Sequence, residues 1–314
     1  MNQHEQTLEF HKILDMLADL AANDITKEKI RAISPTSDLA EARAELEKTS
    51  DALRLAIQFG TPPFHAFQDM RMGLRRAKSG ARLSLRDLLE IATILRQIQA
   101  LSDWYDHCTS VETSLDDLFA QLAPVPFLLE KLDRSILSEE EIADTASPAL
   151  NDLRRRIRRA QLKVREQLDG IIRSPQYAKA LQEPIITMRD GRFVVPVKIE
   201  CKNEVKGLVH DTSSSGATVF IEPMAVVDAN NEIRMLQNEE QLEIDRILQE
   251  FSERIGQVAD ATRDSFAALL QLDLLFAKSR LADKMKATVP ELNEEGIIEF
   301  RKARHPLINK EKVV

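Results

Sequence analysis

Two narrow apolar stripes with helical spacing, far apart in the chain, constrain the fold most strongly. In the first, apolar residues recur at steps of three and four: Leu153, Ile157, Ala160, Val164, Leu168 and Ile171. The second has the same character and is interrupted by Glu240: Ile233, Leu236, Ile244, Ile247, Phe251, Ile255 and Val258. Stripes this narrow are typical of helices that pair in a coiled coil. We therefore predict two long helices packed against each other, the first over residues 149–174.

Between the two stripes the apolar period changes from helical to alternating. Asp190 and Gly191 give a strong hairpin-turn signal, and two further turn signals follow before the second stripe. This pattern predicts a small antiparallel meander of about four strands within residues 185–222. Pro196 favours an edge or bulge position for its strand, because proline cannot donate a hydrogen bond to the ladder.

The rest of the chain is predicted to be mainly helical. The expected helices cover residues 7–20, 39–59, 84–105, 111–122 and 259–286, with a short helix near residues 26–30, an irregular stretch up to residue 80 and a strand at residues 297–300. The 314 residues include only nine glycines, which suits a helical chain because average usage is about 7%. No glycines have the spacing of a G-x-x-x-x-G-K-[ST] or G-x-G-x-x-G loop, so neither phosphate-binding loop is present.

The cysteines, histidines and apolar runs exclude several other classes of protein. Cys108 and Cys201 are too few for a disulfide framework or a four-cysteine zinc site. The six histidines form no H-x-x-x-H pair, so no metal site is expected. The polar N-terminal residues lack signal-peptide character, and no apolar run approaches the roughly 20 residues of a membrane span. We expect a cytoplasmic protein without a membrane partner.

The distribution of charge is more informative than the net charge of −8. Residues 151–210 contain 14 Lys/Arg and 7 Asp/Glu, a local net charge of +7 that leaves −15 for the rest. Basic residues near the turns of a small sheet can contact phosphates without reading bases. The candidate nucleic-acid-binding residues are Arg189, Arg192, Lys198, Lys202 and Lys206. Base stacking is not expected, because alternation places Phe193 and Phe220 in the core.

Two other groups of residues invite a functional interpretation. One is a run of cations on the first stripe helix: Arg154, Arg155, Arg156, Arg158, Arg159, Lys163 and Arg165. Acids on the returning helix can pair with these cations, so a solvated coiled-coil surface is the favoured interpretation, with nucleic-acid binding as the alternative. The other group is His210, Asp211 and serines 213–215. Adjacency in a turn does not supply the converging geometry of a hydrolase triad, so no catalytic residue is predicted.

Several strings of residues resemble one known family. G-R-F-V-V-P-V-K at 191–198, G-L-V-H-D at 207–211, S-S-S-G-A-T-V-F-I-E-P at 213–223 and N-N-E at 230–232 resemble the clamp of type-two bacterial MutS proteins. R-H-P-L at 304–307 resembles the segment that leads into the ATPase domain of that family. The resemblance covers essentially the whole chain, and the clamp strings are its most specific part.

The resemblance implies a mainly α fold: a helical core/lever domain with an inserted antiparallel coiled-coil arm, capped by a small antiparallel β-sheet. The expected domains are core/lever residues 1–148 and 259–300, a clamp at 149–258 with its sheet near 185–222, and the start of a truncated ATPase domain at 301–314. This branch lacks a mismatch-reading domain. The fragment itself is expected to be neither an enzyme nor a holder of a cofactor.

For the full-length parent, the resemblance implies an ATPase with ATP and Mg²⁺ in the missing domain, and a nuclease-type C-terminal domain. The parent is expected to form a homodimer that embraces nucleic acid. Two targets are implied: branched DNA in recombination control, and the rRNA-rich particle in the rescue of stalled ribosomes. The rival interpretation is a structural or protein-interaction lever without direct nucleic-acid contact.

Overall fold

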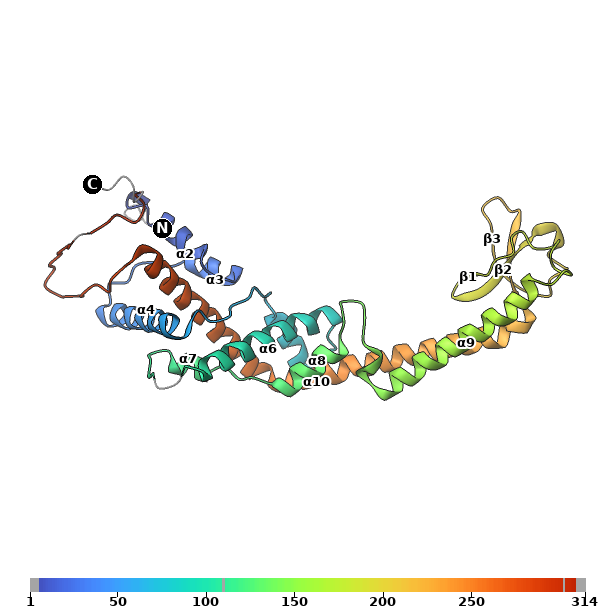
Figure 1. Ribbon diagram of the computed structural model, residues 1–314, viewed down its shortest axis with the longest axis horizontal. Helices are drawn as coiled ribbons and strands as arrows, with labels where there is room; N and C mark the ends of the chain where they lie inside the picture. Colours follow the sequence, from blue (N-terminus) through green and yellow to red (C-terminus); the bar gives the residue numbers. More distant parts are fainter. Residues whose placement is uncertain (1–5, 109–110, 302, 309–314) are drawn as a thin grey trace. The chain divides into compact units, whose positions relative to one another are not determined.

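The computed structural model describes residues 6–108, 111–301 and 303–308, and it confirms a mainly helical chain with one small antiparallel sheet (Figure 1). The chain divides into two compact units. Unit 1 takes residues 1–133 and 251–314, and unit 2 takes residues 134–250. Unit 2 is therefore an insertion in the sequence of unit 1. The domain limits at residues 149 and 258 stay a prediction.

Unit 1 is built from helices whose ends follow local capping rules. They are α2 (Phe10–Ala18), α3 (Asp24–Arg31), α4 (Leu39–Phe59), α5 (Arg71–Lys78), α6 (Leu85–Asp106), α7 (Asp116–Ala120), most of α8 (Pro126–Ser135) and the last part of α10 (Met224–Met285). The Asp38 side chain accepts hydrogen bonds from the first backbone N–H groups of α4. Ser84 and Asp87 form a capping box at the start of α6. These two helices begin where the sequence predicts.

The core of unit 1 joins early helices to the last part of α10. Phe276 is fully buried and meets Trp104 edge-on, with 5.7 Å between ring centroids. The buried carboxylate of Asp273 accepts hydrogen bonds from the backbone N–H groups of Ala22 and Asn23 at 3.0 and 3.1 Å. Asp273 thereby satisfies orphan donors just before α3 and fixes that helix to α10.

Helix α5 lies in the stretch that the sequence analysis assigned as irregular, so that expectation is wrong. Its apolar stripe consists of Met70, Leu74 and Ala77, which are 2–3% exposed. The stripe is only two turns long, and four cations and a glycine surround it. Short stripes diluted in this way lack a clear helical period.

Other expectations in unit 1 are also wrong. Helix α8 was not predicted. The predicted helix at 111–122 is reduced to α7. Asp116 accepts hydrogen bonds from the backbone N–H and the hydroxyl of Thr113, and such local bonds compete with helix formation just before α7. Residues 297–300 form no strand.

In unit 2, α9 (Pro148–Ile172) and the first part of α10 lie side by side, which confirms the paired helices (Figure 1). Ser147 caps α9 through the N–H of Leu150, and proline occupies the first turn, where it is best tolerated. The two apolar stripes meet in a shared cluster of Leu153, Ile157 and Leu236. Glu240, which interrupts the second stripe, binds Arg154 with 2.6 Å between Oε1 and Nε. The interruption is thus a cross-helix ion pair.

The sheet of unit 2 has four antiparallel strands, but it is not a meander. The strands are β1 (Thr187–Arg189), β2 (Arg192–Lys198), β3 (Gly207–Thr212) and β4 (Thr218–Pro223), in the order β1-β2-β4-β3. Asp190 and Gly191 have φ of 49° and 74°, as a two-residue type I′ hairpin requires. The longer connection after β2, which contains a 3-10 turn (Ile199–Cys201), leaves β4 free to pair with β2.

Pro196 was expected at an edge or a bulge. β2 lies between β1 and β4, but β1 pairs only with residues 192–194 of β2, so Pro196 has a strand partner on its β4 side alone. The carbonyl of Pro196 accepts a hydrogen bond from the N–H of Gln182 at 2.9 Å. In a strand, the nitrogen and carbonyl of one residue face the same neighbour. The missing donor of Pro196 therefore faces the irregular segment near Gln182 and costs no ladder bond to β4.

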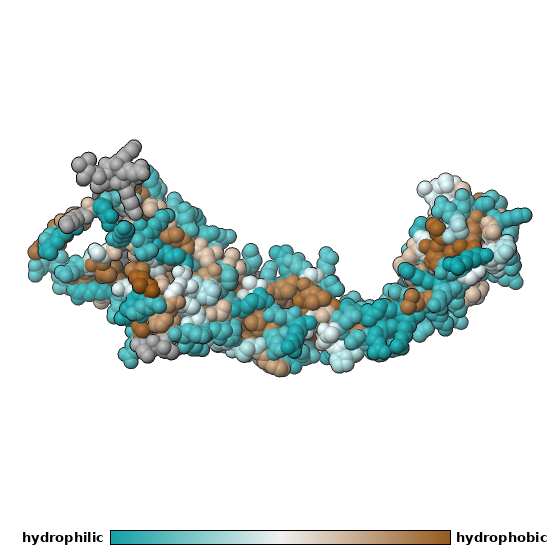
Figure 2. Space-filling model, in the orientation of Figure 1, coloured by the Kyte–Doolittle hydropathy of each residue, from teal (hydrophilic) through white to brown (hydrophobic). Residues whose placement is uncertain are grey.

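One face of the sheet packs on α9 and α10, and the other carries charged side chains. The packed face and the helices share a core of Phe193, Val195, Val197, Val219, Ile221, Val164, Leu168, Val226 and Ile233. The register places Phe220 on the opposite face, where its ring is only partly buried, so its expected core position is wrong. Figure 2 shows a largely hydrophilic surface along α9 and apolar residues over the sheet.

Candidate nucleic-acid interface

Arg192, the first residue of β2, is committed to an internal ion pair. Its Nη1 donates to both carboxylate oxygens of Glu222 at 2.8 and 3.0 Å, and its Nη2 donates to Asn231 at 2.7 Å. The Glu222 side chain is 0% exposed, whereas that of Arg192 is 15% exposed. Arg192 therefore neutralises a buried carboxylate and has little of its charge left for a ligand.

Glu222 has two further partners from other elements of unit 2. His210, the extra residue of a β-bulge in β3, donates through Nε2 at 2.5 Å. Asn230 of α10 donates through Nδ2 at 2.8 Å, and it also exchanges hydrogen bonds with both backbone groups of Phe193. The carboxylate thus joins β2, β3, β4 and α10 in a satisfied buried network.

Arg189, at the end of β1, lies on the same face of the sheet and is also partnered. Its Nε is 3.1 Å from the carboxylate of Asp211. Its guanidinium carbon lies 3.9 Å from the ring centroid of Phe220, a cation–π contact. Because the side chain is still 36% exposed, Arg189 is partly available to a ligand.

The three predicted lysines have no ion-pair partner among the residues that the structure describes, but they do not form one cluster. Lys202 and Lys206 are exposed, and Lys198 is half-buried. Lys198 pairs with Thr218 in β4, whereas Lys206 directly precedes the residue that pairs with Pro223. The stretch of β4 between those partners spans about 17 Å. The lysines are therefore distributed along the sheet.

The arginine run on α9 separates into paired and unpaired side chains. Arg154 binds both Glu240 and Asp144, Arg158 binds Asp144 at 3.1 Å, and Arg156 is 3.9 Å from Glu239. In the described parts of the chain, Arg155, Arg159 and Lys163 are exposed and form no ion pair. These three residues recur every four positions, so they lie near one another on α9 at about 6 Å per step.

Nearby ion pairs and hydrogen bonds shift the pKa values of two titratable groups in unit 2. The hydrogen bond from Arg154, together with Arg158, holds the pKa of Asp144 below its usual range. A hydrogen bond with Glu204 raises the pKa of the Cys201 thiol. Cys201 is therefore a protonated, weakly nucleophilic thiol at neutral pH.

The His210, Asp211 and serine group does not converge as a hydrolase triad would. His210 binds Glu222, and Asp211 binds Arg189 and the backbone N–H of Thr212. The hydroxyl of Ser213 accepts a hydrogen bond from the N–H of Thr218 and closes the β3–β4 turn. Over residues 6–108, 111–301 and 303–308, no three His, Cys, Asp or Glu side chains are placed to hold a metal ion.

The roles of Glu222 and Asn230 were not predicted from the sequence. Both stand within the strings that carry the family resemblance. A polar residue at an otherwise apolar strand or helix position is the only local signal for such a network. The cations of α5 were missed as a group, because α5 itself was not predicted.

The chain is similar along its whole length to curated proteins named "Endonuclease MutS2". It is 39% identical over 315 residues to the one from Caldicellulosiruptor saccharolyticus, with 100% of this chain and 40% of that protein covered. It is 42% identical over 310 residues to the one from Acetivibrio thermocellus, with 98% and 39% covered. The protein of the same name from Ruminiclostridium cellulolyticum is 40% identical over 311 residues, with 98% and 39% covered.

The chain therefore spans about 40% of the length of the curated relatives that it matches. No protein-family model matches it. In the part of the chain that the structure describes, no helix combines the length and apolarity that a membrane span requires.

Proposed function

Because this chain is a MutS2-type sequence along its whole length, we propose that it is the nucleic-acid-embracing core and clamp of a MutS-type ATPase. The proposed ligand is branched DNA or the rRNA of a stalled ribosome, bound by a homodimer of the longer protein. We place ATP and Mg²⁺, and any endonuclease activity, in parts of that protein outside these 314 residues. The chain itself then binds and positions nucleic acid and performs no chemistry.

The proposal rests mainly on three lysines that form no ion pair within the described structure. Lys198, Lys202 and Lys206 belong to unit 2 and have no ion-pair partner within its described residues. A free ammonium can contact a phosphate and release a counterion without first breaking an internal ion pair. Such contacts position a backbone and carry no base specificity. We expect these lysines to make the main phosphate contacts, with a smaller contribution from Arg189.

The unpaired cations of α9 extend the proposed interface. Arg155, Arg159 and Lys163 are exposed, and within the described residues they take no part in the ion pairs that join α9 to α10. Arg192 has a different role in the proposal, since it holds Glu222 and the sheet. The sequence grouped Arg192 with the lysines, but its removal is expected to damage the fold before it affects binding.

Charge reversal of the three lysines tests the proposal. We expect the chain to bind a four-way DNA junction at low salt, and K198E/K202E/K206E to lose at least about tenfold in affinity. The matched control K29E/K284E/K286E makes the same change of charge in unit 1. If both variants lost the same affinity for the junction, the loss would reflect net charge alone, and a binding site on the sheet would be contradicted.

Affinity for two ligands distinguishes the targets. The chain is titrated with a four-way DNA junction and with purified ribosomes at the same salt concentration, because affinities at different salt are not comparable. A preference of tenfold or more for one ligand, abolished in K198E/K202E/K206E, identifies the target. The absence of any detectable affinity for both at low salt would contradict the proposal.

One observation favours a second candidate function, a protein-binding module. Met188, Leu208 and Val209 are 48%, 47% and 55% exposed on the strands that form the two edges of the sheet. Exposed apolar residues at sheet edges are suited to contacts with protein. Substitution of Leu208 and Val209 with serine would leave DNA binding unchanged under the main proposal. Loss of a protein partner without loss of DNA binding would support the alternative.

A further inference from the structure

A hollow of about 460 Å³ opens on unit 1 where α5 meets α10. Charged side chains around it are Arg71, Arg75, Lys78, Arg263, Asp69 and Asp260. Met72, Leu74 and Ala259 provide an apolar floor. None of the residues that line the hollow belongs to the proposed nucleic-acid interface on unit 2. The lining combines cations with an apolar surface.

Close backbone contact fixes the two helices that form the hollow. Gly256 of α10 lies so near α5 that a Cβ added there would be 2.7 Å from the carbonyl oxygen of Ala77. Only glycine permits this approach. Arg71, Arg75 and Lys78 recur at steps of four and three, so they share one face of α5. The cations are therefore presented from a rigid pair of helices, as a binding site requires.

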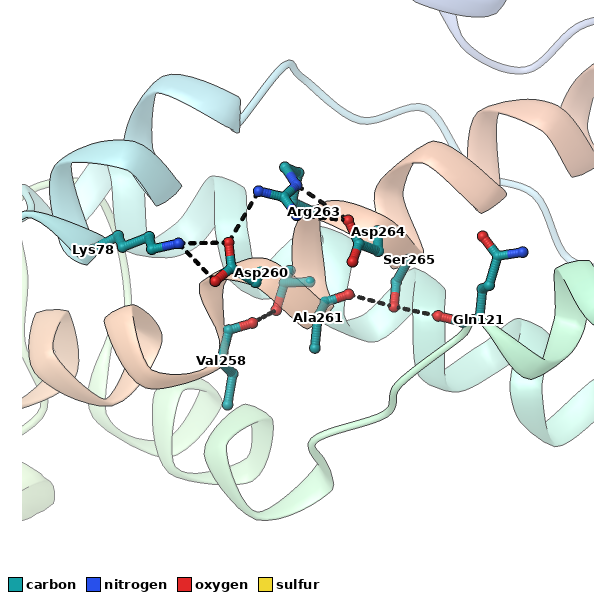
Figure 3. Close-up of polar contacts among 9 residues, drawn as sticks. Lys78, Gln121, Val258, Asp260, Ala261, Arg263, Asp264 and Ser265 are labelled. Carbon is teal, nitrogen blue, oxygen red and sulfur yellow. Dashed lines mark hydrogen bonds and ion pairs between the residues drawn. The ribbon is translucent and has the colours of Figure 1, made fainter.

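The two acids of the hollow do not neutralise all four cations. Asp69 is engaged by Arg71, whose Nε is 2.9 and 3.0 Å from its two oxygens. The carboxylate of Asp260 accepts hydrogen bonds from Nζ of Lys78 at 2.6 and 2.7 Å and from Nη1 of Arg263 at 2.9 Å. Figure 3 draws these contacts as dashed lines. Arg263 also binds Asp264, which lies outside the lining.

Arg75 is the one cation of the hollow that forms no ion pair among the described residues, and its charge acts on Asp69 only at longer range, where it helps to lower the pKa of that carboxyl group. Within the described structure, its guanidinium donates a hydrogen bond only to the sulfur of Met72, at 2.8 Å. A thioether is a weak acceptor. A guanidinium next to an open, partly apolar hollow is suited to a planar, bidentate contact with a phosphate.

We propose that this hollow binds an organic phosphate of nucleotide size, with the phosphate on Arg75 and the organic part on the Met72 and Leu74 floor. Lys78 and Arg263 would then turn from Asp260 to the phosphate, which carries more charge than a carboxylate. The volume lies within the usual 300–1,000 Å³ of small-molecule sites. Two sources can supply this phosphate, a free nucleotide and a nucleic-acid strand. The site is in unit 1 and does not depend on the lysines of the sheet.

Calorimetric titration of the chain at low salt tests the site, with AMP, adenosine and a thymidine tetranucleotide as probes. We expect saturable binding of AMP or the tetranucleotide and none of adenosine. R75Q should lose at least about tenfold in affinity, whereas R31Q, an exposed arginine elsewhere in unit 1, should not change it. An unchanged thermal midpoint shows that R75Q is folded. Binding of the tetranucleotide alone identifies a strand as the source, and binding of AMP identifies a free nucleotide.

A second pair of variants separates the hollow from general electrostatics. D260N removes the carboxylate that competes for Lys78 and Arg263, so it should tighten phosphate binding severalfold. D106N makes the same change of charge on an exposed residue of unit 1 outside the hollow, and it should have no such effect. Failure of AMP and the tetranucleotide to bind, or equal effects of the two asparagine variants, would overturn the proposal. The junction titration with the sheet lysines is unaffected by either result.

Discussion

Replacement of Arg192 with alanine should destabilise the sheet of unit 2, and the cost can be worked from its contacts. Arg192 donates to both oxygens of Glu222 at 2.8 and 3.0 Å, and that carboxylate is 0% exposed. Removal of one partner from a buried ion pair costs about 3–5 kcal/mol. His210 and Asn230 keep two hydrogen bonds to the carboxylate. We therefore expect the lower end of that range, about 3 kcal/mol.

Hydrogen exchange followed by mass spectrometry measures this cost at the sheet itself. A loss of about 3 kcal/mol corresponds to roughly 100-fold faster exchange of β2 and β4 amides through opening of the sheet. R192A/E222Q should recover part of the loss, because a neutral amide is less costly to bury than an unpaired carboxylate. K206A, which removes an exposed charge, should stay within about 0.5 kcal/mol of the native chain. Native exchange rates in R192A, with only nucleic-acid affinity reduced, would refute this assignment.

Four further predictions concern three glycines and one acid. G256A should lower the stability of unit 1 by about 1–2 kcal/mol, because the new Cβ meets the Ala77 carbonyl and overpacking exceeds the gain in helix propensity; fluorescence of the single tryptophan reports this. G170A, with open space around it on α9, should instead stabilise unit 2 by about 0.5–1 kcal/mol in a denaturant melt followed by circular dichroism. G191A should cost about 1 kcal/mol in sheet-specific exchange, because φ is 74° there. For Asp144, the folded pKa is depressed, so its stabilisation is present above the unfolded value near 4 and is lost as pH falls through the folded value. D144N should remove this loss of stability at low pH, which is worth less than about 1 kcal/mol because the site is partly exposed. If the stability of D144N fell with decreasing pH as steeply as that of the native chain, the ion pairing of Asp144 would be contradicted.

Local rules predicted the elements whose signals lie within a few residues. Ser147 and Pro148 mark the start of α9, and Asp190 and Gly191 mark the hairpin, because caps and tight turns depend on adjacent backbone groups. The paired helices followed from two long stripes. Helix α5 was not predicted, because its apolar stripe covers only two turns.

Strand order was beyond local rules. The hairpin between β1 and β2 is set by its turn, but whether β3 or β4 pairs with β2 depends on the long connection after β2 and on packing against the helices. A meander, in which consecutive strands pair, is the simplest expectation for four short strands. In this sheet β4 lies between β2 and β3 instead. The interior position of β2 followed from the same non-local choice.

The candidate site was predicted from the local excess of basic residues, and the ion pairs of the folded sheet change which of these residues are available to a ligand. All five cations counted equally in the sequence. Arg192 is neutralised by Glu222 and Arg189 is paired with Asp211, partners 30 and 22 positions away whose approach only the folded sheet creates. The three lysines form no ion pair within the described structure, so no fixed contact has to be broken before they meet a ligand.

The dependence of affinity on salt tests the role of the three lysines most directly. For duplex-containing junction DNA, each neutralised phosphate contributes about 0.9 to the slope of log affinity against log salt. If Lys198, Lys202 and Lys206 each neutralise one phosphate, K198Q/K202Q/K206Q should reduce the slope by about 2.7. Parallel salt dependences for the variant and the native chain would contradict nucleic-acid binding through the sheet of unit 2.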